Sequence, residues 1–133
     1  MSDYLTLREV LAIHCDQIYR YGGSSGVRDP GALEAALARP QSGYYADLIE
    51  EAAALWESLA QNHPFIDGNK RTAFAVTYTF LTINGGRFVP DAATTFAFIT
   101  DCYARNHFDF TTIESWLRGA VVLDGSTNTD ANP

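Results

Sequence analysis

The residues best suited to chemistry lie in one short stretch, HPFIDGNKRT, residues 63–72. This stretch contains one of only three histidines, His63, and the only lysine of the chain, Lys70. Because an imidazole exchanges a proton near neutral pH, His63 is a candidate general base. Asp67 supplies the kind of hard oxygen that binds Mg²⁺ when substrate phosphates complete the coordination.

The residues that follow Asp67 favour the binding of an anion. The first turn of a helix has unpaired N–H groups and a partial positive charge. Gly68 lets the backbone approach an anion closely, and Lys70 and Arg71 add two positive charges, the arginine as a fork suited to phosphate oxygens. A base, a metal ligand and a phosphate site so close together predict phosphoryl or nucleotidyl transfer. Phe65 would point the other way and anchor the loop in the core.

Each of these residues also fits a purely structural role. A histidine before proline, followed by Asp-Gly-Asn, is compatible with an ordinary capped turn, and Lys70 and Arg71 with a solvated first turn. Their joint occurrence at fixed spacing is what favours a functional site.

The elements that must position this stretch are predicted to be helices. Capping residues, hydrophobic periodicity and Gly or Pro breaks place them at about residues 7–21, 30–39, 47–62, 71–84, 91–105 and 111–123. Residues 71–84 contain a strand-like Val-Thr-Tyr-Thr-Phe run, but their length favours a buried helix. We therefore expect an all-α bundle with one central buried helix, preceded by the motif loop. A second capping box at Thr111–Glu114 is expected to open the last helix.

The segments between helices are predicted to be turns and connectors. Residues 22–27 lack the GxxxxGK(S/T) pattern of a phosphate loop and are interpreted as a turn. Residues 40–46 are expected to form an exposed connector or a short hairpin. His14 is interpreted as a core histidine and His107 as structural or exposed. Cys15 and Cys102 are expected to be reduced core residues, because no CxxC spacing is present.

Length and composition predict one domain over residues 1–124 and a disordered polar tail over residues 125–133. The formal net charge of −7 argues against direct nucleic-acid or anionic-membrane binding, although it is compatible with a local nucleotide site. We find no signal peptide and no apolar run of membrane-spanning length, so a cytoplasmic location is expected.

The sequence HPFIDGNKRTA resembles the signature of the Fic/Doc family, HxFx(D/E)xNxR. Residues 18–41, IYRYGGSSGVRDPGALEAALARPQ, resemble the N-terminal region of the death-on-curing (Doc) branch, and the likeness extends over most of residues 5–122. The resemblance implies a Fic fold and an ATP- and Mg²⁺-dependent enzyme. It implies these roles: catalytic base, His63; Mg²⁺ ligand, Asp67; anion hole, Asn69; loop anchor, Phe65; phosphate contacts, Gly68, Lys70 and Arg71.

Two departures from the adenylylating members concern the transferred group. Those members usually have glycine where this chain has Lys70, and arginine where it has Phe74. Doc toxins share both changes, and the resemblance implies that they act as kinases, passing the ATP γ-phosphate to a threonine of elongation factor Tu. Pro64 and Gly68 match the adenylylating consensus, so adenylyl transfer remains an alternative. A catalytically idle nucleotide- or partner-binding module is the third hypothesis.

The resemblance also implies partners. The family's inhibitory pattern (S/T)xxxE(G/N) does not occur in the sequence, so inhibition is expected to come from a separate antitoxin chain. The stretch PQSGYYAD takes the place of the family's target-binding flap, which Tyr44 and Tyr45 would line. An alternative role for these tyrosines is simple packing at a helix start.

Overall fold

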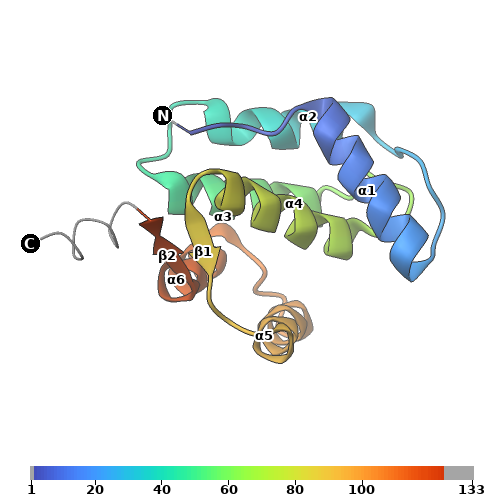
Figure 1. The fold of residues 1–133 in the computed structure, drawn as a ribbon. Coiled ribbons are helices and arrows are strands. Elements are labelled where there is room, and N and C mark those ends of the chain that lie inside the picture. Colours follow the sequence, from blue (N-terminus) through green and yellow to red (C-terminus); the bar gives the residue numbers. More distant parts are fainter. Residues whose placement is uncertain (1, 125–133) are drawn as a thin grey trace, which may run out of the picture.

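Helices make up most of the structure, a computed structural model that describes residues 2–124 (Figure 1). Its helices are α1 (Leu7–Tyr21), α2 (Pro30–Ala38), the short 3₁₀ helix η1 (Arg39–Gln41), α3 (Leu48–Gln61), α4 (Asn69–Ile83), α5 (Ala92–Ala104) and α6 (Phe110–Ala120). Two strands, β1 (Gly86–Phe88) and β2 (Val121–Leu123), pair antiparallel with Gly86 opposite Leu123. The predicted mostly helical fold is confirmed, and the two short strands are an addition to it.

Most helices begin where a capping side chain predicts. Thr6 and Glu9 form the expected reciprocal box at the start of α1, and an aspartate accepts a backbone N–H at the start of α2, α3, α5 and α6. The exception is α4, whose N-cap is Gly68 in the left-handed conformation, with no side-chain cap. The first turn of α4 therefore keeps its N–H groups and its partial positive charge available for another partner.

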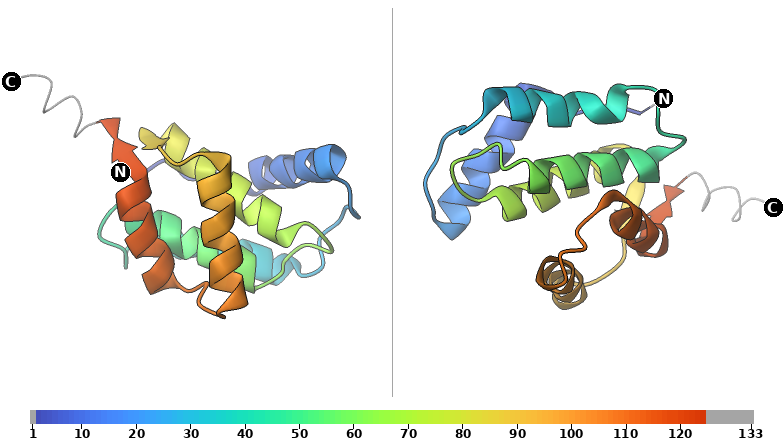
Figure 2. Two further views of the ribbon diagram at one scale, coloured as in Figure 1. Left: turned by 90° about the horizontal axis from the view of Figure 1, so that it is seen from below. Right: turned by 180° about the vertical axis from the view of Figure 1, so that it is seen from behind.

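The helices form three layers, with α3 and α4 in the middle (Figures 1 and 2). Helices α1 and α2 cover one side, whereas α5 and α6 lie on the other. The buried helix predicted over residues 71–84 is α4, but α3 is buried more completely, through Ala52, Ala53 and Ala54 among others. From α3, the side chain of Trp56 contacts the rings of Phe74 and three aromatic residues of the α5–α6 region: Phe98, Phe108 and Trp116.

The last helix differs from its prediction at both ends. Asp109, and not Thr111, is the N-cap of α6, because its carboxylate accepts the N–H of Thr112 at 3.0 Å. The predicted capping box at Thr111–Glu114 is therefore wrong. The helix ends at Ala120, and the β-branched pair Val121-Val122 continues as strand β2 against β1.

Both ends of the described chain are hydrogen-bonded to the residues that follow α4, at the end of this helix away from the motif. The Asn84 side chain accepts the backbone N–H of Asp3 at 2.7 Å and donates to the Asp3 carbonyl at 2.8 Å. The N–H of Asp124 donates to the Gly85 carbonyl at 2.9 Å. The predicted tail, residues 125–133, lies outside the described residues.

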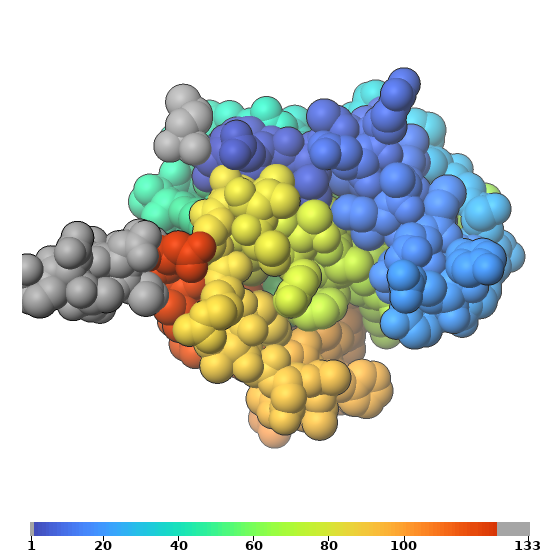
Figure 3. Space-filling view, viewed as in Figure 1, coloured from blue at the N-terminus to red at the C-terminus, as the bar shows by residue number. Residues whose placement is uncertain are grey.

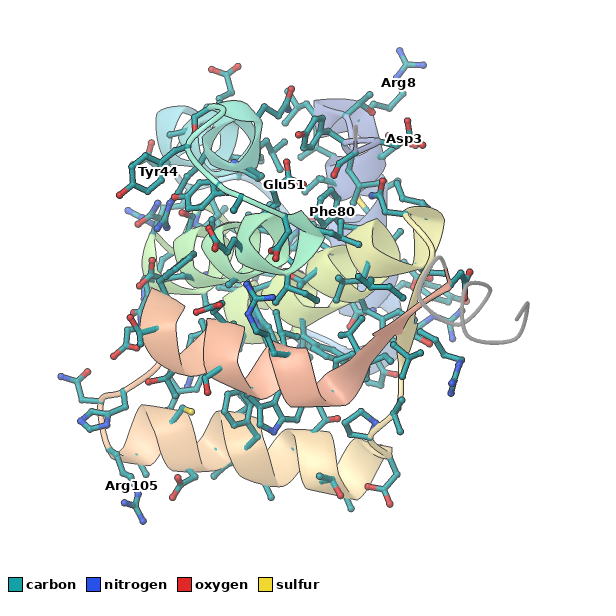
Figure 4. The ribbon with its side chains drawn as sticks, turned by 90° about the vertical axis from the view of Figure 1, so that its left-hand side faces the viewer. Asp3, Arg8, Tyr44, Glu51, Phe80 and Arg105 are labelled. Atoms are coloured by element: carbon teal, nitrogen blue, oxygen red, sulfur yellow. The ribbon has the colours of Figure 1, made fainter. Side chains whose placement is uncertain are left out.

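The connector between α2 and α3 does not form the hairpin that the sequence left open. After η1, residues 42–47 follow an irregular path that Arg39 fixes by donating to the Tyr45 hydroxyl at 2.7 Å and to Glu57 at 2.8 Å. Tyr44 is 83% exposed and projects from the surface, whereas Glu51 points inward from α3 (Figure 4).

The two cysteines are free thiols, but only one is a core residue. Cys102 is buried, as predicted, whereas Cys15 is exposed on the outer face of α1, so the prediction for Cys15 is wrong. No helix within residues 2–124 combines the length and the apolar character needed to cross a membrane.

Candidate active site

Residues 62–68 (NHPFIDG) form a loop between α3 and α4, which we call the motif loop. It runs beside residues 26–29, which precede α2, at the right-hand edge of Figure 1. Val27 and Phe65 form an antiparallel bridge, and Ile66 donates to the Gly26 carbonyl at 3.0 Å. The N–H groups of Arg28 and Asp29 both donate to the Pro64 carbonyl, at 2.8 and 3.0 Å. The backbone of the motif loop is thus fixed by a segment more than 30 residues earlier.

The inner side of the motif loop packs against α1. Phe65 is 1% exposed and stacks on the ring of His14, with 3.9 Å between centroids and 5° between planes. The Nε2 atom of His14 lies 2.8 Å from the carbonyl oxygen of Asp67, and since a carbonyl can only accept, the imidazole donates. The prediction of His14 as a satisfied core histidine is confirmed, and its partner is the motif itself.

Asn69 closes the motif loop on itself. Its side-chain oxygen accepts the N–H of Phe65 at 2.9 Å, and its side-chain nitrogen donates to the Phe65 carbonyl at 2.9 Å. Both ends of this amide are therefore used within the loop. Asn69 shapes the backbone around the start of α4, and any contact with an anion would come from its main-chain N–H.

The outer side of the motif loop borders a groove of about 410 Å³, the His63 groove. Its lining consists of His63 together with the continuous run Ile66, Asp67, Gly68, Asn69, Lys70 and Arg71. His63 is exposed and has a backbone φ of +48°, which is uncommon for a residue with a side chain. Gly68 has a φ of +73°, and a Cβ there would lie 3.0 Å from Ile18 and 3.2 Å from the Arg71 guanidinium. Both the backbone conformation and the close neighbours therefore favour glycine at position 68.

The carboxylate of Asp67 is held by backbone donors at the edge of this groove. Its two oxygens accept the N–H of Gly68 at 2.8 Å and the N–H of Ser24 at 3.2 Å. These hydrogen bonds, Ser24 first, lower the pKa of Asp67 below its usual value, so the group is ionised at neutral pH.

One exposed carboxylate fits a magnesium ion that shares its coordination with phosphates. Residues 2–124 contain no cluster of three or more His, Cys, Asp or Glu side chains suited to a metal, which is the arrangement that a protein-only site would need. Mg²⁺ often takes one or two carboxylates plus phosphate oxygens and water. Asp67 is the residue that would hold it.

The two cations of the groove are oriented by neighbouring elements. The ammonium of Lys70 lies over the ring of Tyr103 in α5, 4.2 Å from its centroid. The guanidinium of Arg71 donates to the Gly22 carbonyl at 2.9 Å and lies 5.8 Å from the centroid of Tyr21. Within residues 2–124 neither cation forms an ion pair with a carboxylate, so their charge remains available to an anion.

The sequence did not reveal the part played by residues 22–26, the glycine loop. It was interpreted as a turn, but Gly22 and Ser24 contact Arg71 and Asp67 directly. A Cβ on Gly23 would lie 2.7 Å from the Asp67 carboxylate, so any other residue there would displace that carboxylate. The cluster of glycines indicated that the backbone here is unusual. It could not indicate that this segment contacts the motif loop, which lies about 40 residues later in the sequence.

Tyr44 and Tyr45 do not line the His63 groove. Tyr45 borders a different pocket, with Tyr4, Glu51 and Asn84 at the other end of α4. Its ring packs 5.6 Å from that of Phe110. The contact of Tyr45 with Phe110 fits the alternative of packing at a helix start, and the role of both tyrosines in a target-binding flap stays a prediction.

A mostly helical bundle that presents a histidine, a carboxylate and two cations around an uncapped helix start is the arrangement of a Fic-fold protein. The chain belongs to the Fic/DOC family, whose model matches residues 4–81. It is 46% identical over 96 residues to Toxin Doc of Mycolicibacterium smegmatis, an alignment that covers 68% of this chain and 72% of that protein. It is also 38% identical over 86 residues to Protein kinase doc of Escherichia phage P1, covering 62% of this chain and 68% of that protein.

Proposed function

We propose that this chain is the toxin of a toxin–antitoxin pair and acts as an ATP- and Mg²⁺-dependent protein kinase. The observation that carries the proposal is the lining of one groove by His63, Asp67 and the cationic, uncapped start of α4. The names of the two relatives, one a toxin and one a protein kinase, support it.

The residues of the groove would divide the reaction between them. The imidazole of His63 accepts the proton of a target hydroxyl, whose oxygen then forms a bond to the γ-phosphorus of ATP. The bond from that phosphorus to the β–γ bridging oxygen breaks, and ADP leaves with the electron pair. Lys70, Arg71 and the first N–H groups of α4 bind the phosphate oxygens. Asp67 would hold Mg²⁺, which neutralises phosphate charge.

Phe74 favours transfer of the γ-phosphate over transfer of AMP. It stands where adenylylating members of the family have an arginine, and its ring packs against Trp56, Tyr78 and Phe88. The chain therefore lacks a cation at this position of α4. One observation keeps adenylyl transfer as a second candidate: the Lys70 ammonium lies over Tyr103, so the lysine does not itself fill the space beside Gly68.

We infer that the protein substrate is a translation factor, elongation factor Tu first among them, and that the reaction arrests translation in the cytoplasm. The inhibitor would be a cognate antitoxin on a separate chain. The net charge of −7 argues against direct nucleic-acid binding.

The decisive experiment is incubation with elongation factor Tu, Mg²⁺ and ATP labelled at either the α- or the γ-phosphate. Kinase activity would transfer the γ-label and increase the intact mass of the factor by one phosphate. Transfer of the α-label, with a mass gain of AMP, would establish the second candidate instead.

His63→Ala should lower transfer by roughly 10²–10⁴-fold, because a general base typically supplies a factor of that size. Asp67→Ala should also impair it, by weakening Mg²⁺ binding. Growth arrest on expression and label transfer are the two measurements. Toxicity that survives His63→Ala unchanged would indicate a catalytically idle binding module.

A further inference from the structure

Arg28 lies beside the residue proposed as the base but outside the motif. It belongs to residues 26–29, the segment that pairs with the motif loop, and its N–H donates to the Pro64 carbonyl at 2.8 Å. Its Nε donates to the carbonyl of His63 at 2.7 Å, and its Nη2 donates to the carbonyl of Asn62 at 2.9 Å. One planar guanidinium thus holds two successive carbonyl groups.

Those two carbonyls occur where the backbone leaves the helical conformation. Asn62 is the C-cap of α3, with φ −85° and ψ −9°, and the next residue, His63, has φ +48°. Carbonyl groups at a helix C-terminus have no partner within the helix, and they attract a cation. A left-handed conformation at a non-glycine residue persists only when its surroundings enforce it. Arg28 and the bonds to Pro64 supply those surroundings.

We propose that Arg28 is a positioning residue: its guanidinium fixes the left-handed backbone of His63 and thereby the direction in which the imidazole enters the groove. The inference rests on the proposed function in that it assigns a purpose to the orientation of His63. Arg28 acts through the carbonyls and does not line the groove itself. The anion-binding side of the loop is shaped independently, by the Asn69 bonds to Phe65.

Because Arg28 supports His63 but not the phosphate-binding residues, its removal should change kcat and not the KM for ATP. In Arg28→Ala, the start of α4 still binds phosphates, so the KM for ATP should stay within about twofold of the wild type. The kcat should fall by roughly tenfold to a hundredfold, because misplacing a reacting group by about 1 Å has a cost of that order. The loss should be smaller than that of His63→Ala. Arg28→Lys, which keeps the charge but lacks the rigid planar fork of the guanidinium, should be intermediate.

A direct measurement of His63 needs neither ATP nor a target. The backbone chemical shifts of His63 and its HN–Hα coupling report its φ angle in solution. In Arg28→Ala these values should move away from the left-handed conformation, with a small change in Tm because the two hydrogen bonds are exposed. Arg8→Ala is the matched control, since Arg8 is an exposed arginine in the first turn of α1 and projects into solvent (Figure 4). Tyr21, at the opposite end of α1 towards Arg28, lies roughly 20 Å further along the helix axis.

The outcomes separate the inference from the proposed function. Unchanged His63 shifts in Arg28→Ala, or a lower Tm with an unchanged kcat, would overturn the positioning role and leave Arg28 as a simple cap of α3. If Arg28→Ala does not fold, the same readings on Arg28→Lys decide. Wild-type protein that transfers no label, while His63 shifts still respond to Arg28→Ala, would refute the kinase and retain the positioning.

Discussion

Single residues of the site are held by partners that the motif does not contain. Lys70 rests on Tyr103, Arg71 on Gly22 and Tyr21, and Asp67 on Ser24. The motif supplies the chemical groups, whereas α1, α5 and the glycine loop decide where those groups point. A substitution in any of these supports can therefore change the site without touching the motif.

Lys70→Gly tests whether the lysine contributes to phosphate binding. Loss of one charged hydrogen-bond donor should lower phosphotransfer by about tenfold to a hundredfold. It need not create an adenylylating enzyme, because position 74 remains a phenylalanine. Lys70→Met is the control that keeps the apolar stem on Tyr103 and avoids placing a glycine in the first turn of α4. Unaltered transfer in both variants would mean that the lysine does not contact phosphates.

Tyr103 should ionise later than a solvent-exposed tyrosine, because much of its ring is buried. Burial, with a smaller effect from Cys102, raises its pKa from 10.0 to about 12. The neutral phenol is therefore favoured in the folded protein. Its contribution to stability is complete below pH 10 and is lost as the pH rises towards 12. A tyrosinate absorbance titration should show this late step in the wild type and lose it in Tyr103→Phe. A titration with no difference between the two would contradict the assignment.

At the scale of elements, α4 differs from the other α-helices at its first residue. Side chains cap α1, α2, α3, α5 and α6. A side-chain cap is worth about 1 kcal/mol, and α4 has none because its N-cap, Gly68, has no side chain. Beside this open helix start, Gly23 of the glycine loop has even less space for a side chain than Gly68, 2.7 Å against 3.0 Å to the nearest atom.

Gly23→Ala should disturb the Asp67 carboxylate, because its Cβ would lie 2.7 Å from Oδ2. We expect weaker Mg²⁺ dependence and lower transfer. Gly22→Ala is the matched control: Gly22 also has a positive φ, +85°, but nothing lies within 4 Å of its Cβ position. Both variants should lose roughly 1–3 kcal/mol of stability from backbone strain, which thermal unfolding would measure. An equal loss of Mg²⁺ dependence in both would show that strain, and not contact with Asp67, is responsible.

How far the sequence predicted these elements depends on whether the determining contacts are local. Thr6, Asp29 and Asp47 act on residues three positions away, and the helices that they start were predicted to within a residue or two. The β1–β2 pair joins residues more than 30 positions apart, and three-residue strands have no periodicity of their own. In the last helix, the sequence predicted the cap at Thr111, whereas the structure has Asp109 in that role.

The same limit applies to the candidate site. The motif placed His63, Asp67, Lys70 and Arg71 together because they are neighbours in the sequence. The glycine loop and Arg28 lie beside the motif because residues 26–29 pair with residues 64–66. No local sequence pattern predicts this pairing.

At the scale of the whole molecule, Trp56 joins the middle layer to the layer formed by α5 and α6. It is 1% exposed and contacts aromatic rings from α4, α5 and α6. Helix α5 stands out from the body in the space-filling view (Figure 3), and its exposed outer face includes Phe96. The attachment of α5 therefore depends on the rings that gather around Trp56.

Trp56→Ala should lower the free energy of unfolding by about 3–5 kcal/mol, since it removes a large side chain from the centre of the core. Phe96→Ala is the control, because Phe96 is 70% exposed and its loss should change stability little. Denaturant unfolding followed by circular dichroism would measure both. Equal stabilities for the two variants would contradict the central role of Trp56.

The hydrogen bonds of Asn84 and Gly85 at the C-terminal end of α4 have a practical consequence for protein engineering. Because Asp3 and Asp124 are both bound to Asn84-Gly85, a short linker could join the two ends of the described chain there. The polypeptide could then be reopened at Gly43, an exposed glycine with a φ of +83° and no neighbour to obstruct it. Such a circular permutant would keep the histidine, the carboxylate and both cations on one uninterrupted piece of chain. It would also offer two new termini for reporters or regulatory fusions, in the connector between α2 and α3.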